Sequence, residues 1–348
     1  MAETYKCPGC GAPITFDGAT GMMVCEYCET QVDVTQMDII NDMYNENVVD
    51  ETPVEREYCN FDGYKCESCG AEIVTDEFTS ATFCSFCGSP AMIKGRLSSA
   101  LKPQKVIPFR VEKDAAVAAY KKWAGKGLVT PSGFRKESTI EKITGIYVPF
   151  WLYDYGVDAH VNARATKTRK DRKGDTIYTH TDHFNVGRHV KAEFARIPAD
   201  ASEKMDDRMM DLLEPYNYSD LTDFKIPYLS GYQSERYTYD ANQLAPRVEN
   251  RVRQYIIDEA RRTINGYSSV TITSSNVKLS RHNALYTLMP VWILNYNYKG
   301  KMHTFAMNGQ TGKVVGEIPK SFGKIAAWFG GILASVSGIL MLLGGLFG

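Results

Sequence analysis

Eight of the nine cysteines fall into two sets that share one spacing. In each set two CxxC pairs are separated by 14 residues, and adding 59 to every position of the first set gives the second. The sets are Cys7, Cys10, Cys25 and Cys28, then Cys66, Cys69, Cys84 and Cys87. Four thiolates in such a frame are typical of a tetrahedral metal site. The sequence therefore predicts two Cys₄ sites that hold two Zn²⁺ ions, in a reducing compartment such as the cytosol.

The segments around the cysteine pairs have the layout of a zinc ribbon: knuckle, strand, turn, strand, knuckle. Gly11, Gly70 and Gly88 each follow the second cysteine of a pair, where a tight turn requires a positive φ. Glu29 takes this place in the remaining pair, so we expect that turn to be less regular. One alternative is that the cysteines bind iron in place of zinc. The other is that each CxxC is a redox dithiol, but a redox CxxC usually stands alone at the start of a helix. Cys59 is predicted to be a spare thiol.

The C-terminal residues 325–347 contain no charged side chain. Twenty-three helical residues span about 34 Å, which is enough to cross the hydrocarbon core of a bilayer. Lys320 and Lys324 precede this stretch, and a positive flank tends to stay in the cytosol. We therefore expect a single-pass, tail-anchored protein of the cytoplasmic membrane whose N-terminal body lies in the cytosol. A buried core helix is the alternative.

The two ends of the chain carry further signals. The first residues lack the apolar stretch of a signal peptide, so none is expected. Rows of small residues in the C-terminal stretch permit close helix approach, and hence a homo-oligomer. These rows are Ala327, Gly331 and Ser335, and Gly330, Ala334 and Gly338.

The net charge of −1 hides a strong asymmetry. Residues 1–96 carry 17 acidic and 5 basic side chains, a net charge of −12, so the rest of the chain carries +11. A nucleic-acid-binding module needs Lys and Arg to neutralise phosphates, and this acidic third would repel DNA. The basic remainder suits an anionic lipid surface or the acidic third itself.

The pattern after Lys102 predicts an α+β body. The expected domains are ribbon 1 (1–31), an acidic linker that is flexible or loosely helical (32–58), ribbon 2 (59–96), the body (97–320) and the transmembrane helix (325–347). Apolar periodicity and turn signals define the elements of the body. Strands are expected at 105–109, 147–168, 175–190, 269–279, 288–298, 303–307 and 313–318. Helices are expected at 114–123, 138–143, 200–213 and 245–265. Ser138 is expected to cap the second of these helices and Asp200 the third.

One internal similarity suggests a duplication in the body. Residues 147–155 (YVPFWLYDY) resemble 288–296 (LMPVWILNY). A repeated unit of a helix and an antiparallel sheet would give this pattern. Pro149 and Pro290 would then start strands or lie on edges, where a missing N–H does no harm. The tryptophans Trp151 and Trp292 would be core residues.

A search for catalytic motifs yields no nucleotide-binding loop, nucleophile elbow or zinc-protease signature. We therefore predict no catalytic or cofactor-binding residues, and no enzyme. Four histidines could form a metal or acid–base cluster: His160, His180, His183 and His189. Because positions 180 and 183 of one strand point to opposite faces, ordinary sheet histidines are the expected outcome. An enzyme would need a pocket built from His180, His183 and Asp182. The basic run 164–173 would suit lipid head groups or a solvated hairpin tip.

Nearly the whole chain resembles a family of bacterial membrane-anchored proteins with two TFIIB-type zinc ribbons. The segments that carry the resemblance are CPGC, CEYC, CESCGAEI, TFCSFCG, ITGIYVPFWLYD, PADASEKMDD, MPVWILNYNY, FAMNGQTGKVVG and the tail around Trp328. Members are often labelled as replication or primosomal helicase-like, but this sequence lacks ATPase motifs. The resemblance implies partners in a membrane-stress module, either a phage-shock-protein-A-like protein or a flotillin-like SPFH protein.

These observations favour a membrane adaptor that binds zinc and recruits a cytosolic protein. The alternative is a membrane-tethered replication or transcription factor that binds nucleic acid, which the ribbon type favours and the charge of −12 over residues 1–96 opposes.

Overall fold

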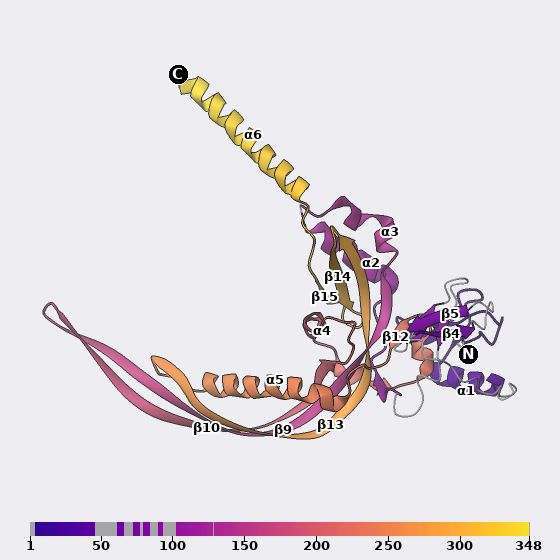
Figure 1. Cartoon of the computed structure of the whole chain (residues 1–348), viewed down its shortest axis with the longest axis horizontal. Coiled ribbons are helices and arrows are strands. Elements are labelled where there is room, and N and C mark those ends of the chain that lie inside the picture. Colours follow the sequence, from indigo (N-terminus) through magenta and orange to yellow (C-terminus); the bar gives the residue numbers. More distant parts are fainter. Residues whose placement is uncertain are drawn as a thin grey trace. The chain divides into compact units, whose positions relative to one another are not determined.

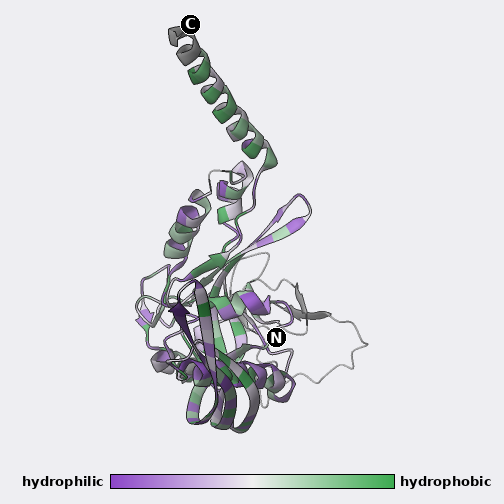
Figure 2. Ribbon diagram, turned by 90° about the vertical axis from the view of Figure 1, so that its left-hand side faces the viewer, coloured by the Kyte–Doolittle hydropathy of each residue, from purple (hydrophilic) through white to green (hydrophobic). Residues whose placement is uncertain are grey.

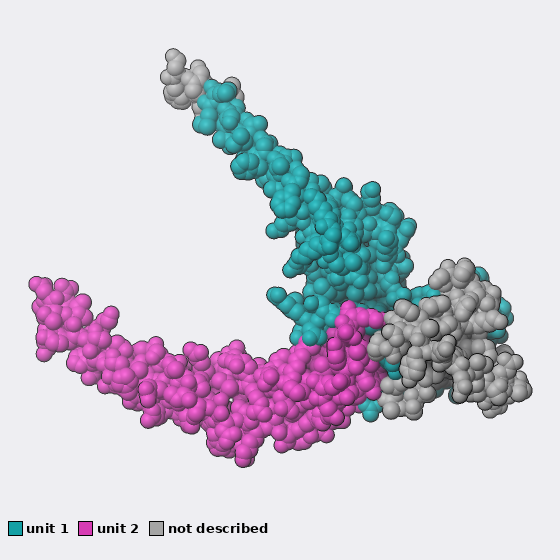
Figure 3. Space-filling model, viewed as in Figure 1, with its two compact units in different colours: residues 1–148, 205–236, 288–348 teal, residues 149–204, 237–287 magenta. Residues whose placement is uncertain are grey.

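The computed structural model describes residues 4–45, 61–65, 72–76, 79–83, 90–92, 102–127 and 129–347. Helices occur with antiparallel and mixed sheets, so the predicted α+β class is confirmed. The order of the elements is shown in Figure 1. The chain divides into two compact units, which Figure 3 colours separately. Unit 1 comprises Met1–Val148, Met205–Arg236 and Leu288–Gly348, and unit 2 comprises Pro149–Lys204 and Tyr237–Thr287.

Unit 1 begins with a three-stranded antiparallel sheet of order β1-β2-β3. Its strands are β1 (Thr15–Asp17), β2 (Met22–Val24) and β3 (Gln31–Val32). Asp17 sets the β1–β2 turn, because its carboxylate accepts hydrogen bonds from the Ala19 amide at 3.0 Å and the Thr20 hydroxyl at 2.7 Å. Phe16 and Met23 point into the small core of this sheet and are buried. Few apolar side chains are available here, so the strands alone bury little surface.

Helix α1 (Val34–Asn45) occupies the first part of the predicted linker 32–58. Asp33 lies directly before it and accepts a hydrogen bond from the Thr35 amide at 2.7 Å. This bond satisfies an N–H group at the helix start and lowers the pKa of Asp33. The beginning of the predicted linker is therefore an ordered helix, and its remaining residues 46–58 lie outside the described part of the chain.

The large sheet of unit 1 has the strand order β11-β8-β13-β9-β12-β6-β7, with β14 paired to β13 and β15 paired to β14. Strands β9 (Thr144–Lys173) and β13 (Ser269–Tyr298) contribute residues 144–148 and 288–298 to unit 1. The shorter strands are β6 (Thr79–Phe83), β7 (Pro90–Met92), β8 (Lys105–Val106), β11 (Thr222–Asp223), β12 (Gln233–Glu235), β14 (Lys301–Asn308) and β15 (Val314–Gly316). Strands β4 (Phe61–Lys65) and β5 (Glu72–Asp76) form a separate antiparallel pair.

Aromatic side chains fill the core of unit 1. Phe109 stacks on Tyr232 with ring centroids 4.0 Å apart and meets Trp292 edge-on at 5.2 Å. Tyr120 of helix α2 packs edge-on against Phe305 of β14 at 5.1 Å. Such rings contribute large buried areas and fixed geometry. The helices around this core are α2 (Lys113–Gly125), η3 (Ser132–Arg135), α3 (Glu137–Ile140), α4 (Asp207–Leu213), η4 (Tyr218–Asp220) and η5 (Ile226–Leu229).

Unit 2 consists of three long strands and one helix. Residues 149–173 of β9 pair antiparallel with β10 (Thr176–Asp200), and residues 269–287 of β13 pair with the other edge of β9. Helix α5 (Ala241–Arg262) covers one face, and its start is fixed by a reciprocal capping box between Asp240 and Gln243. Alternate β9 side chains pack under α5 in one apolar cluster, which includes Tyr153, Tyr155, Val157, Ala159, Val248, Val252 and Ile256.

Two predicted helix starts are wrong. The helix expected at 138–143 begins at Glu137, and its cap residue Lys136 makes no side-chain capping bond. The helix expected at 200–213 begins only at Asp207, where the Asp206 carboxylate accepts from the Met209 amide at 2.8 Å. Asp200 instead ends strand β10, because the ladder with β9 continues to this residue. Long-range strand pairing therefore outweighs the local capping signal.

The proline prediction is also wrong. Pro149 and Pro290 lie inside β9 and β13, which have neighbours on both sides in the sheet. The ladder between β9 and β10 ends at Phe150, and that between β13 and β14 ends at Val291. Each proline therefore lies one residue beyond a ladder, where no N–H is required. Segments 269–279 and 288–298, expected as two strands, are one strand, and the duplication stays a prediction.

Helix α6 (Phe322–Phe347) ends the chain. Figure 2 shows hydrophobic residues along most of its described length. Phe322–Met341 is long and apolar enough to cross a membrane, and none of this stretch is buried within the protein. The start of the helix is tied to unit 1 by the Ser321 amide, which donates to the Val129 carbonyl at 2.8 Å.

Candidate metal centre

The first cysteine pair lies in a tight loop whose backbone is held by two hydrogen bonds. The Cys7 amide donates to the Ala12 carbonyl at 2.7 Å, and the Gly11 amide donates to the Cys7 carbonyl at 2.8 Å. Gly11 has a φ of 73°, the left-handed conformation that glycine adopts without strain. The glycine predicted for this turn therefore has the expected role.

The second pair lies in a loop with the same bonds. The Cys25 amide donates to the Thr30 carbonyl at 3.0 Å, and the Glu29 amide donates to the Cys25 carbonyl at 2.9 Å. Glu29 has a φ of 59°, so it takes the left-handed conformation that Gly11 takes in the first loop. The expectation of a less regular turn is wrong, because the loop keeps its geometry and Glu29 bears the backbone strain.

Glu29→Gly is expected to stabilise the first cysteine module, which we define as residues 4–32. A left-handed non-glycine residue costs about 1–2 kcal/mol, and the added freedom of an unfolded glycine offsets about 0.5–1 kcal/mol of that gain. The net gain is therefore below about 1.5 kcal/mol. Hydrogen exchange of the module measures it, and Gly11→Ala should change protection in the opposite direction. Lower protection in Glu29→Gly would contradict the assignment of strain to this residue.

The two loops bring four sulfur atoms together. The Sγ atoms of Cys7 and Cys28 are 3.5 Å apart, those of Cys10 and Cys25 are 3.6 Å apart, and all four lie within 4.8 Å of one another. These separations exclude disulfides, in which the sulfurs are about 2.05 Å apart. A tetrahedral ion with metal–sulfur bonds of about 2.3 Å needs sulfur separations of about 3.8 Å. The four cysteines, which we call the cysteine cluster, are close enough to hold one metal ion.

The surroundings of the cluster favour a thiolate at Cys28 but not at Cys10. The Thr30 hydroxyl lies 3.1 Å from Cys28 Sγ and lowers the pKa of that thiol to about 6, with help from the Thr30 amide. At Cys10 the Ala12 amide lowers the pKa, but the neighbouring sulfurs outweigh it and raise the pKa to about 12. A thiolate is thus stabilised at Cys28 while the Cys10 thiol keeps its proton, which a bound cation would displace. Sequence reasoning missed Thr30, although its position two residues after a ligand could have indicated it.

Buried contacts hold the module on the η5 segment of unit 1. The Phe16 amide donates to the Ser230 carbonyl at 3.0 Å, and the buried Ser230 hydroxyl donates to the Ile14 carbonyl at 2.7 Å. The ring of Phe16 meets that of Tyr228 edge-on at 5.0 Å. The cysteine cluster is therefore fixed to the rest of unit 1 by contacts that no sequence pattern predicts.

The second set of predicted ligands, Cys66, Cys69, Cys84 and Cys87, lies outside the described residues, as does Cys59. Strands of the second segment are described, however. In the first module Met23 pairs with Val32 and Val24 with Gln31. In the second, Thr82 pairs with Ala91 and Phe83 with Pro90. Each position is shifted by 59, so the repeat in the sequence is also a repeat in strand register.

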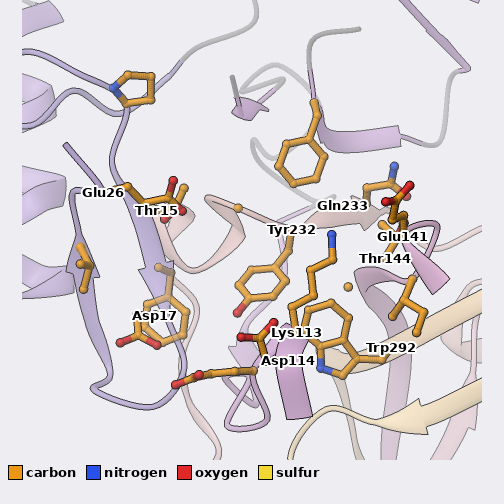
Figure 4. Close-up of a pocket in the computed structure, with 18 of the residues that line it drawn as sticks. Thr15, Asp17, Glu26, Lys113, Asp114, Glu141, Thr144, Tyr232, Gln233 and Trp292 are labelled. Carbon is orange, nitrogen blue, oxygen red and sulfur yellow. The ribbon is translucent and has the colours of Figure 1, made fainter. Parts of the chain in front are cut away.

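An open cleft of about 770 Å³ has residues of the first cysteine module in its wall (Figure 4). The loop between Cys25 and Cys28 contributes Glu26 and Tyr27 to its wall. The buried rings of Tyr232, directly before β12, and Trp292 of β13 also line it. Five carboxylates and one ammonium group surround it: Asp17, Glu26, Glu112, Asp114, Glu141 and Lys113. The cleft therefore suits a positively charged occupant that can also contact aromatic rings.

The histidines of the enzyme hypothesis do not form a pocket. His180, Asp182 and His183 lie on β10 opposite Arg169, Lys167 and Thr166 of β9, where all of them are exposed apart from the half-buried Thr166. The nearest carboxylate recorded for His180 is Asp171, whose Oδ2 is 3.4 Å from Nε2. The structure brings His160 and His189 together instead, because they are directly paired in the ladder.

Comparisons with known proteins give one informative relative. No family model matches the chain, and no solved structure matches it. The chain is similar to YdjG of Bacillus subtilis (strain 168), whose name describes it as an uncharacterized protein. The two sequences are 42% identical over 324 residues, which cover 92% of this chain and 91% of the relative. Identity at this level over nearly the whole of both chains shows that this protein belongs to the same family as YdjG.

Proposed function

We propose that this protein is a zinc-binding adaptor that is attached to the cytoplasmic membrane and recruits a cytosolic protein. The observation that carries the proposal is that the loop between two members of the cysteine cluster, Cys25 and Cys28, forms part of the wall of an acidic cleft. A binding role, rather than a catalytic one, agrees with a cleft whose charged groups are five carboxylates and one ammonium group.

Zinc is the ion that we propose for the cysteine cluster. Zn²⁺ favours four-coordinate thiolate sites in small folds, and such sites supply folding energy that a small core cannot. The shared spacing of the two cysteine sets and the strand register repeated at an offset of 59 support a second site at Cys66, Cys69, Cys84 and Cys87. The two modules would then be TFIIB-type zinc ribbons.

The membrane attachment rests on helix α6. Its apolar stretch Phe322–Met341 suits a single pass. Lys320 lies just before the helix and Lys324 lies in its first turn, so its N-terminal end is positively charged. Because positive flanks stay on the cytosolic side, the body of the protein would lie in the cytosol.

A basic segment of a partner protein fits the acidic cleft. The cleft offers five carboxylates, and residues 1–96 carry a net charge of −12, so the surface attracts cations and repels nucleic-acid phosphates. Family resemblance points to a phage-shock-protein-A-like or an SPFH-type protein as the partner.

The proposal is tested by purifying the full-length protein in mild detergent and identifying bound proteins by mass spectrometry. We expect a membrane-stress or SPFH-type protein to co-purify with the wild type and to be lost from a Glu26→Lys/Asp114→Lys variant. Reversing these two charges removes the attraction for a basic segment, and both side chains lie on the surface, so the fold should persist.

A Lys301→Glu variant is a matched control, because this exposed side chain of β14 is not part of the cleft wall. It should retain the partner. Recovery of replication proteins or of nuclease-sensitive nucleic acid with the wild type would contradict the adaptor function and support the nucleic-acid alternative.

A further inference from the structure

The face of the unit 2 sheet opposite α5 carries polar side chains. Along β9, the odd-numbered residues from Tyr153 to Ala165 are buried, whereas Asp158 is half-buried and His160 is exposed. Asp158 and His160 are two residues apart and therefore project from the same face of the strand. On β10, His189 is directly opposite His160 and Lys191 is directly opposite Asp158. Two imidazoles and one carboxylate thus meet on one open face.

The three side chains are close and aligned. The rings of His160 and His189 are stacked, with centroids 4.1 Å apart and planes 12° from parallel. The distance from Asp158 Oδ1 is 2.8 Å to His189 Nε2 and 3.7 Å to His160 Nε2. Both Nε2 atoms therefore approach the same carboxylate oxygen, but only that of His189 is within hydrogen-bond range.

Lys191 does not occupy the position between the imidazoles. Its Nζ lies 3.9 Å from Asp158 Oδ2, the other oxygen of the carboxylate. Oδ1 therefore remains directed toward the two histidines. All three donor atoms lie within 4.8 Å of one another.

We propose that Asp158, His160 and His189 bind a divalent transition-metal ion such as Zn²⁺. Metal bonds of about 2.0–2.2 Å to imidazole nitrogen and carboxylate oxygen require donor separations near 3.3 Å in a tetrahedral site. The separations of 2.8 and 3.7 Å lie on either side of this value. Because the lone pair of each Nε2 lies in the plane of its ring, the two stacked rings would rotate about χ2 to direct both lone pairs at one ion. Two imidazoles and one carboxylate are donors that suit such ions, and the open face leaves a position for water.

The other histidine–carboxylate pairs of unit 2 lack this arrangement. His180 approaches Asp171 at 3.4 Å, but its partner in the ladder is Arg169, a cation. His282 approaches Glu193 at 3.3 Å across Gly156, but no second imidazole lies within reach of one ion there among the described residues. Among the described residues, only Asp158, His160 and His189 combine two imidazoles with a carboxylate within reach of one ion.

The site is tested by equilibrium dialysis of the full-length protein in detergent against Zn²⁺, with elemental analysis of the bound metal. The cysteine sites are saturated first, and only ions bound beyond them are counted. We expect one additional ion in the wild type. His160→Ala and His189→Ala should each weaken its binding by more than about tenfold, since each removes a direct ligand. His180→Ala is the matched control and should bind the additional ion as the wild type does.

Asp158→Asn provides a second variant that keeps the size of the side chain and removes its charge, and it should also weaken binding. The altered side chains are all at least partly exposed, so circular dichroism and the cysteine-bound metal should stay unchanged in each variant. Absence of an additional ion in the wild type would overturn the proposal. So would its undiminished binding to a His160→Ala/His189→Ala variant. Because the cysteine sites are counted separately, failure here would leave the proposed adaptor function untouched.

Discussion

Cys25→Ser is expected to abolish metal binding by the cysteine cluster and to unfold residues 4–32. Cys25 is fully buried, and its Sγ lies 3.6 Å from that of Cys10. The apolar core of the module consists of a few side chains, among them Ile14, Phe16 and Met23. A module of this size would depend on a bound metal, since structural zinc sites contribute on the order of 10 kcal/mol to folding. Hydrogen exchange and elemental analysis of the full-length variant measure both effects.

Cys59→Ser is the matched control for this experiment, because Cys59 belongs to neither set of four. It should keep the metal content and the exchange protection of the wild type. Unfolding of the module should also expose the buried hydroxyl of Ser230, which loses its bond to Ile14. Full metal content in Cys25→Ser would exclude this residue as a ligand.

Removal of residues 322–348 is expected to move the protein from the membrane to the soluble fraction. Insertion of Phe322–Met341 into hydrocarbon would hold the protein far more firmly than charge attraction at the membrane surface. Alkaline extraction of cell membranes followed by sedimentation gives the distribution. The loss should be nearly complete, whereas the metal content of the cysteine cluster should not change, since none of its four ligands lies near α6 in the sequence.

A chain in which Phe322–Met341 is replaced by a helix of leucine and alanine is the control, and it should stay in the membrane. Retention of the truncated chain in the membrane pellet would show that the basic surfaces of the body hold it there. Appearance of the full-length protein in the soluble fraction would contradict a membrane-spanning role for α6.

The features that are predicted correctly from the sequence depend on residues that are close together along the chain. The spacing of the first cysteine set requires two tight loops, and Gly11 adopts the positive φ that such a loop needs. The apolar periodicity of α5 and the length of α6 are also local properties. Even so, Glu29 departs from the pattern, because the bonds of its loop outweigh the preference of a single residue.

The features that are not predicted from the sequence depend on contacts between residues that are far apart along the chain. The strand ladder that includes Asp200 extends β10 beyond its local signal, so the cap expected there does not form. Pro149 tolerates the interior of a long strand because it lies one residue beyond a ladder. The contact between Ser230 and Ile14 joins residues that are 216 positions apart, and the pairing of His160 with His189 depends on the register of two strands. None of these contacts has a sequence pattern that specifies it.

The metal content of the full-length protein, purified under reducing conditions without added metal, decides whether the cysteine sets are metal sites. We predict at least two zinc ions per chain, with one ion lost in Cys7→Ser and one lost in Cys66→Ser. Cysteines that carry no metal, or that form disulfides in the purified protein, would contradict the assignment of both sets as zinc sites and remove the basis for the proposed adaptor.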